Sequence, residues 1–160
     1  METEATAPTL DQFVSTARSE FAFLTEFGFA EVPQPSARYQ NPFEVHYERE
    51  GWRLVIEGLS YGFCAGISIS SPHGRKAAFG HIVPEEFRKE NRDGLGRGQL
   101  GDIRYEAKAL RAFGQDFLDG DGSIMDELCR LTEEYIERDR QYWRKRDMDR
   151  AITNAAEAFR

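Results

Sequence analysis

Histidine and cysteine, the side chains that most often carry out chemistry, are few and scattered in this chain. The three histidines are His46, His73 and His81, and none lies in an H-E-x-x-H sequence or beside a cysteine pair. No G-x-S-x-G sequence that would present a nucleophilic serine occurs. We therefore predict no catalytic residues, no metal site and no cofactor.

His46 has the most suggestive neighbours of the three. It alternates with Glu44 and Glu48 along a predicted strand, so the three side chains share one face. Such a face could bind a metal ion or adjust the pKa of an imidazole. Side chains two positions apart on a strand stand about 7 Å apart, which is too far for a tight site without further ligands. We expect a solvated histidine at this position.

Two glycine-rich segments resemble ligand-binding loops without meeting their requirements. Residues 96–101 fit G-x-G-x-x-G, but the dinucleotide fingerprint needs a strand directly before it and a βαβ unit around it. Residues 119–122 read Asp-Gly-Asp-Gly, but the sixth and twelfth positions of this calcium-loop candidate hold Ile124 and Arg130. We predict a flexible loop for the first segment and an interhelical turn for the second.

The clearest structural signal lies between Phe43 and Ile69, where three runs alternate apolar and polar residues. Tight turns at 50–51 and 58–62 separate the runs, which predicts an antiparallel meander of three or four strands, the fourth from Lys76 to Val83. Its apolar face is predicted to hold Phe43, Val45, Tyr47, Trp52, Leu54, Ile56, Phe63, Ala65, Ile67 and Ile69. Its polar face is predicted to hold Glu44, His46, Glu48, Arg53, Val55 and Glu57.

Helices are predicted on both sides of the meander. Apolar residues from Leu10 to Leu24 recur at helical spacing and stop before Gly28. After the meander we expect a short helix from Pro84, a loop over 91–101, and a further helix capped by Asp102. The predicted fold class is α+β: a three- to four-stranded antiparallel meander packed against an N-terminal helix and two or three C-terminal helices. Residues 1–9 are expected to be a disordered lead, and residues 10–160 a single domain with a charged C-terminal helix.

The balance of charge bears on the partners of this protein. The chain has 28 acidic and 21 basic residues and a net charge of −7, so it repels phosphate backbones and we expect no nucleic-acid binding. An acidic surface favours a basic protein partner or serves only solubility. No apolar run approaches the roughly 18 residues of a membrane helix, and residues 1–4 lack the features of a signal peptide. Cys64 and Cys129 show no pairing pattern, which favours reduced thiols and a cytoplasmic location.

The C-terminal segment is dense in charges of both signs. Ten of the fourteen residues from Glu137 to Arg150 are charged, so we expect this helix to project from the body or to lie on its surface. A basic patch with aromatic residues could contact nucleic acid, but the interleaved acids favour a solvated helix with internal ion pairs. Trp143 is the residue here best suited to an interface, because aromatic side chains anchor protein contacts.

Two stretches carry a resemblance to a known group of proteins. The first is Phe21-x-Phe23-Leu24-x-x-x-Gly28-Phe29, ahead of the strand pair from Phe43, and the second is Tyr105-x-x-x-Ala109-Leu110-Arg111 followed by Asp116-x-Leu118-x-Gly120-Asp121. In this order, over roughly residues 13–135, the chain resembles small bacterial α+β proteins that look like immunity proteins of polymorphic toxin systems. The resemblance implies an inhibitory, protein-binding role and supplies no catalytic residues. The C-terminal helix lies outside it.

Three functions stay open at this point. The first is a non-enzymatic protein-binding module, an immunity-type inhibitor of a basic toxin, with the partner-binding residues Glu44, His46, Glu48, Glu57, Asp119, Asp121 and Trp143. The second is a small-molecule or metal-dependent enzyme with a dispersed site that includes His46, His73, His81 and Asp121. The third is a structural or oligomeric protein that uses the helix around Trp143, although the sequence does not fix an oligomeric state.

Overall fold

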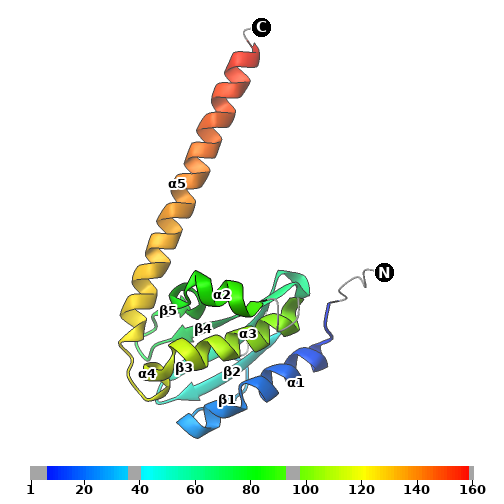
Figure 1. The fold of residues 1–160 in the computed structure, drawn as a ribbon, viewed down its shortest axis with the longest axis vertical. Helices are drawn as coiled ribbons and strands as arrows, with labels where there is room; N and C mark the ends of the chain where they lie inside the picture. Colours follow the sequence, from blue (N-terminus) through cyan, green and yellow to red (C-terminus); the bar gives the residue numbers. More distant parts are fainter. Residues whose placement is uncertain (1–6, 36–40, 93–97, 159–160) are drawn as a thin grey trace.

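The computed structural model describes residues 7–35, 41–92 and 98–158. Within these residues, a five-stranded antiparallel sheet in the order β1-β2-β3-β4-β5 is covered on one face by helices, which confirms the predicted α+β class. Figure 1 shows α1 (Leu10–Glu20) and α3 (Gly98–Phe113) side by side over this face, and α5 (Ile124–Ala158) leaving the body.

Each strand pairs with the next along the chain, as a meander requires. The strands are β1 (Ala30–Val32), β2 (Glu44–Arg49), β3 (Trp52–Leu59), β4 (Cys64–Ser70) and β5 (Lys76–Ala78). Glu50 and Gly51 have φ of 50° and 84°, which is the backbone geometry of a tight hairpin turn. The sequence does not predict β1, because three residues are too few to show an alternation. The expected strand at 76–83 ends at Ala78 and continues as the 3-10 helix η3 (Phe79–Ile82).

The N-terminal helix begins with a capping box. Thr9 Oγ1 accepts a hydrogen bond from the Gln12 amide at 3.2 Å, and Gln12 Oε1 accepts one from the Thr9 amide at 2.9 Å. The helix that the sequence predicts from Leu10 to Leu24 is divided into α1 and a 3-10 helix, η1 (Ala22–Phe27), which ends at Gly28 with φ 82°. Of the expected lead, residues 1–6 lie outside the described residues.

The segment before α3 corrects one prediction. After α2 (Glu85–Arg92), the sequence predicts a loop to residue 101, but residues 98–101 form the first turn of α3, and Gln99 is buried there. Gly96 and Arg97 lie outside the described residues. The low helix propensity of glycine favours a loop, and packing of α3 on β4 overrides it. Asp102 is therefore not a cap; its Oδ2 accepts a hydrogen bond from the Ala65 amide at 3.1 Å.

The hydrophobic core lies between the sheet and the helices. Its largest fully buried side chains are Phe13, Phe21, Leu24, Leu54, Ile56, Ile69, Phe79, Ile103, Leu110, Phe117, Leu118 and Met125. The predicted apolar face is correct except for Phe63, which is 72% exposed because it caps the short 3-10 helix η2 (Ser60–Gly62) before β4 begins. On the opposite face, Val55 is buried.

Helix α5 confirms the expected projecting segment. Ile124, Met125 and Leu128 are buried where α5 packs against β5 and η3, whereas every residue from Glu133 to Ala158 is exposed. In Figure 1 this second part of the helix extends freely from the body. None of the helices in the described part of the chain is both long and apolar enough to span a bilayer.

Arg49, the last residue of β2, joins three segments of the chain. Its guanidinium donates to the carbonyl oxygen of Phe27 at 2.9 Å and to those of Phe117 and Leu118 at 2.8 and 2.5 Å. It also lies 4.3 Å from the centroid of the Phe29 ring. The accepting carbonyls end η1 and α4 (Gln115–Leu118), where helical carbonyls carry partial negative charge; that of Phe117 also accepts a hydrogen bond from the Gly120 amide at 3.1 Å. We call this arrangement the Arg49 clamp.

We expect the Arg49→Met substitution to lower the free energy of unfolding by about 2–4 kcal/mol, because the apolar stem stays and the donors to three carbonyls are lost. Urea unfolding followed by circular dichroism measures the change. Arg53→Met is the matched control, since among the described residues the ion-pair partner of Arg53 is Glu48, on the sheet surface, and its loss should cost less than about 1 kcal/mol. Equal losses in the two variants would contradict the clamp.

Candidate functional site

The polar face of the sheet gathers four of the predicted site residues. The register places Glu44 opposite Glu57, His46 opposite Val55, and Glu48 opposite Arg53. The next strand adds Ser68 beside Val55, and β5 adds Lys76 beside Ser70. The predicted grouping of Glu44, His46, Glu48 and Glu57 on one face is therefore present.

His46 is buried on this face rather than solvated as expected, with 6% of its surface exposed. Its Nε2 lies 2.7 Å from Glu44 Oε2, which also accepts a hydrogen bond from Gln34 Nε2 at 2.9 Å. His46 Nδ1 is buried and has no hydrogen-bond partner among the described residues. Strand spacing predicts that Glu44 and His46 stand about 7 Å apart, but their side chains lean together into direct contact.

The other two carboxylates of the polar face are also paired. Glu57 Oε1 accepts a hydrogen bond from Ser68 Oγ at 2.6 Å and lies 3.3 Å from Lys76 Nζ. Glu48 forms an ion pair with Arg53 on the adjacent strand. Because each carboxylate has a partner within the sheet, the charge that this face offers to another molecule is largely compensated.

A second set of acidic residues lies around the Arg49 clamp. Glu50 follows Arg49 in the chain, Glu26 precedes Phe27, and Asp116 and Asp119 flank the two clamped residues of α4. The Asp121 amide donates to the Asp116 carbonyl at 2.8 Å, which brings it to the same place. We call this set, Glu26, Glu50, Asp116, Asp119 and Asp121, the acidic end; all five are exposed.

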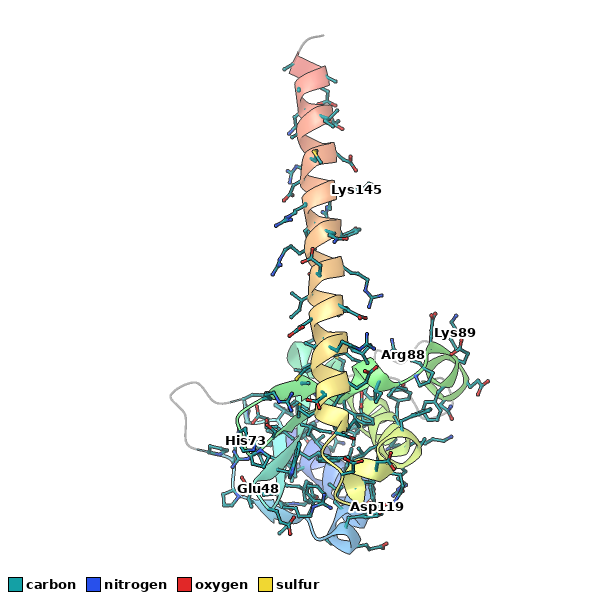
Figure 2. All side chains as sticks on the ribbon, turned by 90° about the vertical axis from the view of Figure 1, so that its left-hand side faces the viewer. Glu48, His73, Arg88, Lys89, Asp119 and Lys145 are labelled. Carbon is teal, nitrogen blue, oxygen red and sulfur yellow. The ribbon has the colours of Figure 1, made fainter. Side chains whose placement is uncertain are left out.

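The acidic end differs from the polar face because its carboxylates stay available. Asp119 accepts hydrogen bonds from the Gln115 side-chain amide, and Asp121 accepts one from the Ser123 amide at 2.9 Å, which lowers the pKa of Asp121. Within the described residues, none of the five forms an ion pair. Figure 2 places Asp119 at the bottom of the body, on the side opposite the projecting helix.

A cleft of about 700 Å³ opens where α5 leaves the body. Residues from β4, β5, η3, α2, α3 and α5 line it, and its ionisable members are His81, Arg88, Asp102, Tyr105, Glu106, Tyr135, Arg138 and Asp139. The ring of His81 lies 5.2 Å from that of Tyr135. Burial, followed by the charges of Arg88 and Arg138, lowers the pKa of His81, so its imidazole is neutral at neutral pH.

The cleft does not assemble the dispersed enzyme site that the sequence allows. Of His46, His73, His81 and Asp121, only His81 lines the cleft; His46 lies on the polar face, His73 in the exposed turn before β5, and Asp121 at the acidic end. Among the described residues, no group of three or more histidine, cysteine or acidic side chains could hold a metal ion.

Sequence patterns do not point to the cleft residues, because six separate elements supply them. One signal is visible in retrospect within α3, where Asp102 and Glu106 stand four residues apart and Glu106 lies among residues of the buried stripe. A buried carboxylate on such a stripe indicates a special environment.

Trp143, the remaining predicted residue, lies on the free part of α5. It is 46% exposed, its ring is 5.5 Å from that of Tyr142, and the guanidinium of Arg146 lies 4.8 Å over it. Figure 2 labels Lys145 far up the helix from Asp119, so Trp143 and the acidic end belong to different surfaces.

We expect Arg88→Gln to raise the pKa of His81 towards its ordinary value of 6.5, because one of the two nearby cations is removed. Tyr135→Ala should raise it further, because burial is the larger cause. Titration of the imidazole by NMR measures both changes, with Lys89→Gln, on the same helix but paired with Glu85, as the control.

The sign of the pH effect follows from the same pKa. The unfolded chain binds the proton of His81 more readily than the folded chain, so the stabilisation from neutral His81 is complete above pH 6.5 and is lost as the pH falls through the lowered value. A pKa of His81 that neither Arg88→Gln nor Tyr135→Ala changes would contradict this account of the cleft.

Comparisons with protein-family models, with curated proteins and with solved structures found no match to this chain. Any role for the acidic end, the polar face or the cleft is therefore inferred from their geometry and charge.

Proposed function

We propose that this protein is a non-enzymatic binding module that holds a basic protein partner at its acidic end. The observation that carries the proposal is the set of five exposed carboxylates around the Arg49 clamp, none of which has an ion pair within the described residues. A surface with charge of one sign accelerates association with an oppositely charged partner and selects against acidic proteins.

The pairing of the sheet carboxylates supports the choice of surface. Glu44, Glu48 and Glu57 are bound to His46, Arg53 and Lys76, so a basic partner would have to compete with these contacts. In the described part of the chain, Asp119 and Asp121 accept hydrogen bonds from neutral groups, the Gln115 side chain and the Ser123 amide, and form no ion pair. The predicted electrostatic contact is therefore assigned to the residues of the acidic end.

A narrower version of the proposal is an immunity-type inhibitor that neutralises a basic toxin in the cytoplasm. The resemblance over residues 13–135 motivates it, and the acidic end lies within that range. In this version the partner is encoded next to this protein, and co-expression of the two restores growth. If co-expression does not restore growth, the immunity role is wrong. The binding proposal is tested separately, by the association rates of the variants below.

The cleft supports a second candidate function, the binding of a small polar molecule. Its volume of about 700 Å³ lies within the range of small-molecule sites, roughly 300–1,000 Å³. Neutral His81 offers hydrogen bonds to such a ligand, and the cleft carries charges of both signs, from Arg88 and Arg138 and from Asp102, Glu106 and Asp139. A ligand in the cleft would shift the imidazole NMR signals of His81, whereas a protein bound at the acidic end would leave them unchanged.

We expect the triple substitution Glu50→Gln, Asp116→Asn and Asp119→Asn to slow association with the partner at least about tenfold at low salt. Full-length protein captures the partner from an extract of its host, and surface plasmon resonance with the purified partner then measures the rate. Asp121 is kept because its carboxylate holds the Ser123 amide at the start of α5.

The matched control is Glu85→Gln, Glu86→Gln and Glu90→Gln, which removes the same charge from exposed positions of α2. This control should bind as the unmodified protein does. The difference between the two variants should shrink as salt is added, because exposed charges are screened. Equal association rates of the two variants at low salt would refute the proposed surface.

A further inference from the structure

The free part of α5 presents a stripe of residues that is complementary to the same stripe on a second copy of the chain. Starting at Leu131, positions that alternate in steps of four and three run along one side of the helix. We call this stripe the α5 seam: Leu131, Tyr135, Arg138, Tyr142, Lys145, Asp149, Ile152 and Ala156. Its spacing is the heptad spacing by which two helices pack together.

The seam begins on the side of α5 that faces the cleft, because Tyr135 and Arg138 line that cleft. From Tyr135 onward the seam is exposed, with Tyr135 52%, Tyr142 60% and Ile152 63% accessible. Tyr135 also lies against the His81 ring at 5.2 Å, whereas Tyr142 and Ile152 stand clear on the free part of the helix. The exposed apolar side chains of the seam gain free energy when a second helix covers them.

We propose that α5 pairs with α5 of a second copy of this chain as an antiparallel two-helix coiled coil, seam against seam. The apolar ends then meet, with Leu131 beside Ala156 of the second copy and Tyr135 beside Ile152 of the second copy. In the middle, Arg138 meets Asp149 of the second copy, and Tyr142 meets Lys145 of the second copy. The two-fold axis makes each contact occur twice.

Charges next to the seam fit the same arrangement. In an antiparallel pair, Asp139 faces Arg146 of the second copy across the edge of the interface. Arg138, Asp139 and Asp149 form no ion pair within the described part of the chain, and Arg146 rests on the Trp143 ring. Other charges of α5 are already used inside the helix, as in the pairs Arg130–Glu134 and Arg140–Glu137.

Like charges exclude the parallel alternative. A parallel pair would set Arg138, Lys145 and Asp149 each against its own copy, which is unfavourable at all three positions. A shift of the antiparallel pair by one heptad is excluded in the same way. In one direction Asp139 faces Asp139 of the second copy, and in the other Arg146 faces Arg146 of the second copy. The charge pattern therefore specifies one orientation and one register.

Pairing in this register also covers the cleft. The helix end from Ile152 to Ala158 of the second copy comes to lie beside Tyr135, at the mouth of the cleft. The stretch from Tyr135 to Ile152 is 18 residues long and spans about 27 Å, so the two bodies stand at opposite ends of the coiled coil. The inference is independent of the acidic end, which lies on the far side of the body and stays accessible in the dimer.

The test is a charge swap in the full-length protein, followed by sedimentation equilibrium. Unmodified protein is expected to be a dimer. Arg138→Asp alone, or Asp149→Arg alone, places like charges together twice per dimer and should raise the dissociation constant roughly tenfold or more. The double substitution Arg138→Asp with Asp149→Arg restores opposite charges and should restore the dimer.

Two variants on the outer side of α5 are matched controls. Arg144→Asp makes the same charge change as Arg138→Asp, and Asp147→Arg the same change as Asp149→Arg, and both should leave the dissociation constant unchanged. A monomeric unmodified protein would overturn the proposal, and so would a dimer that Arg138→Asp does not weaken or that the double substitution does not restore. Asp149, Arg144 and Asp147 lie on the exposed part of the helix beyond the cleft, so their substitution should leave the thermal unfolding of the body unchanged.

A distance measurement separates the two orientations directly. A spin label at Asn154→Cys, with Cys64→Ser and Cys129→Ser, lies on the outer side of α5. In the antiparallel register the two labels are offset by 21 residues, about 32 Å along the axis, whereas in a parallel pair they have no axial offset. Double electron–electron resonance that shows the short separation would overturn the antiparallel arrangement.

Discussion

The body of this protein depends on the way one guanidinium satisfies the ends of two helices. Arg49 binds carbonyl oxygens that lie 22, 68 and 69 residues away in the sequence, and each belongs to the last turn of a short helix. A helix end that lacks a partner for its carbonyls is costly to bury. The clamp reduces this cost at η1 and α4 together. Just before α5, Trp52 packs so closely on Gly122 that position 122 has no room for a side chain.

The same clamp has an electrostatic consequence. Strand pairing places opposite charges side by side on the polar face, as in Glu48 and Arg53. The segments that meet at Arg49 instead bring together the five carboxylates of the acidic end. Repulsion among exposed like charges opposes the compact state. The hydrogen bonds of the Arg49 clamp offset part of this destabilisation. Unpaired carboxylates that destabilise the fold are typical of a surface that binds another molecule.

Helix α5 shows how far pattern and packing each determine a surface. Its charge density indicates a solvated helix, and the structure confirms that residues 133–158 are exposed, with only the first part of this stretch, at Tyr135, Arg138 and Asp139, lining the cleft. The direction in which the seam faces, however, is set by the burial of Ile124, Met125 and Leu128 against β5 and η3. This anchoring places Tyr135 and Arg138 at the cleft and leaves the rest of the seam in solvent.

The amino-acid sequence is enough to predict the α+β class, the strands β2 to β4 and the grouping of Glu44, His46, Glu48 and Glu57, because an alternation of period two is a local property of the chain. It also determined that α5 is highly charged. Folding in three dimensions is what pairs the polar-face carboxylates, brings Glu26, Glu50 and Asp119 to one surface and places His81 in the cleft. These depend on contacts between residues far apart in sequence, such as those of Arg49, and local patterns carry no information about such contacts. The first turn of α3 illustrates the same limit, since glycines that favour a loop become helical once packing on β4 supplies the free energy.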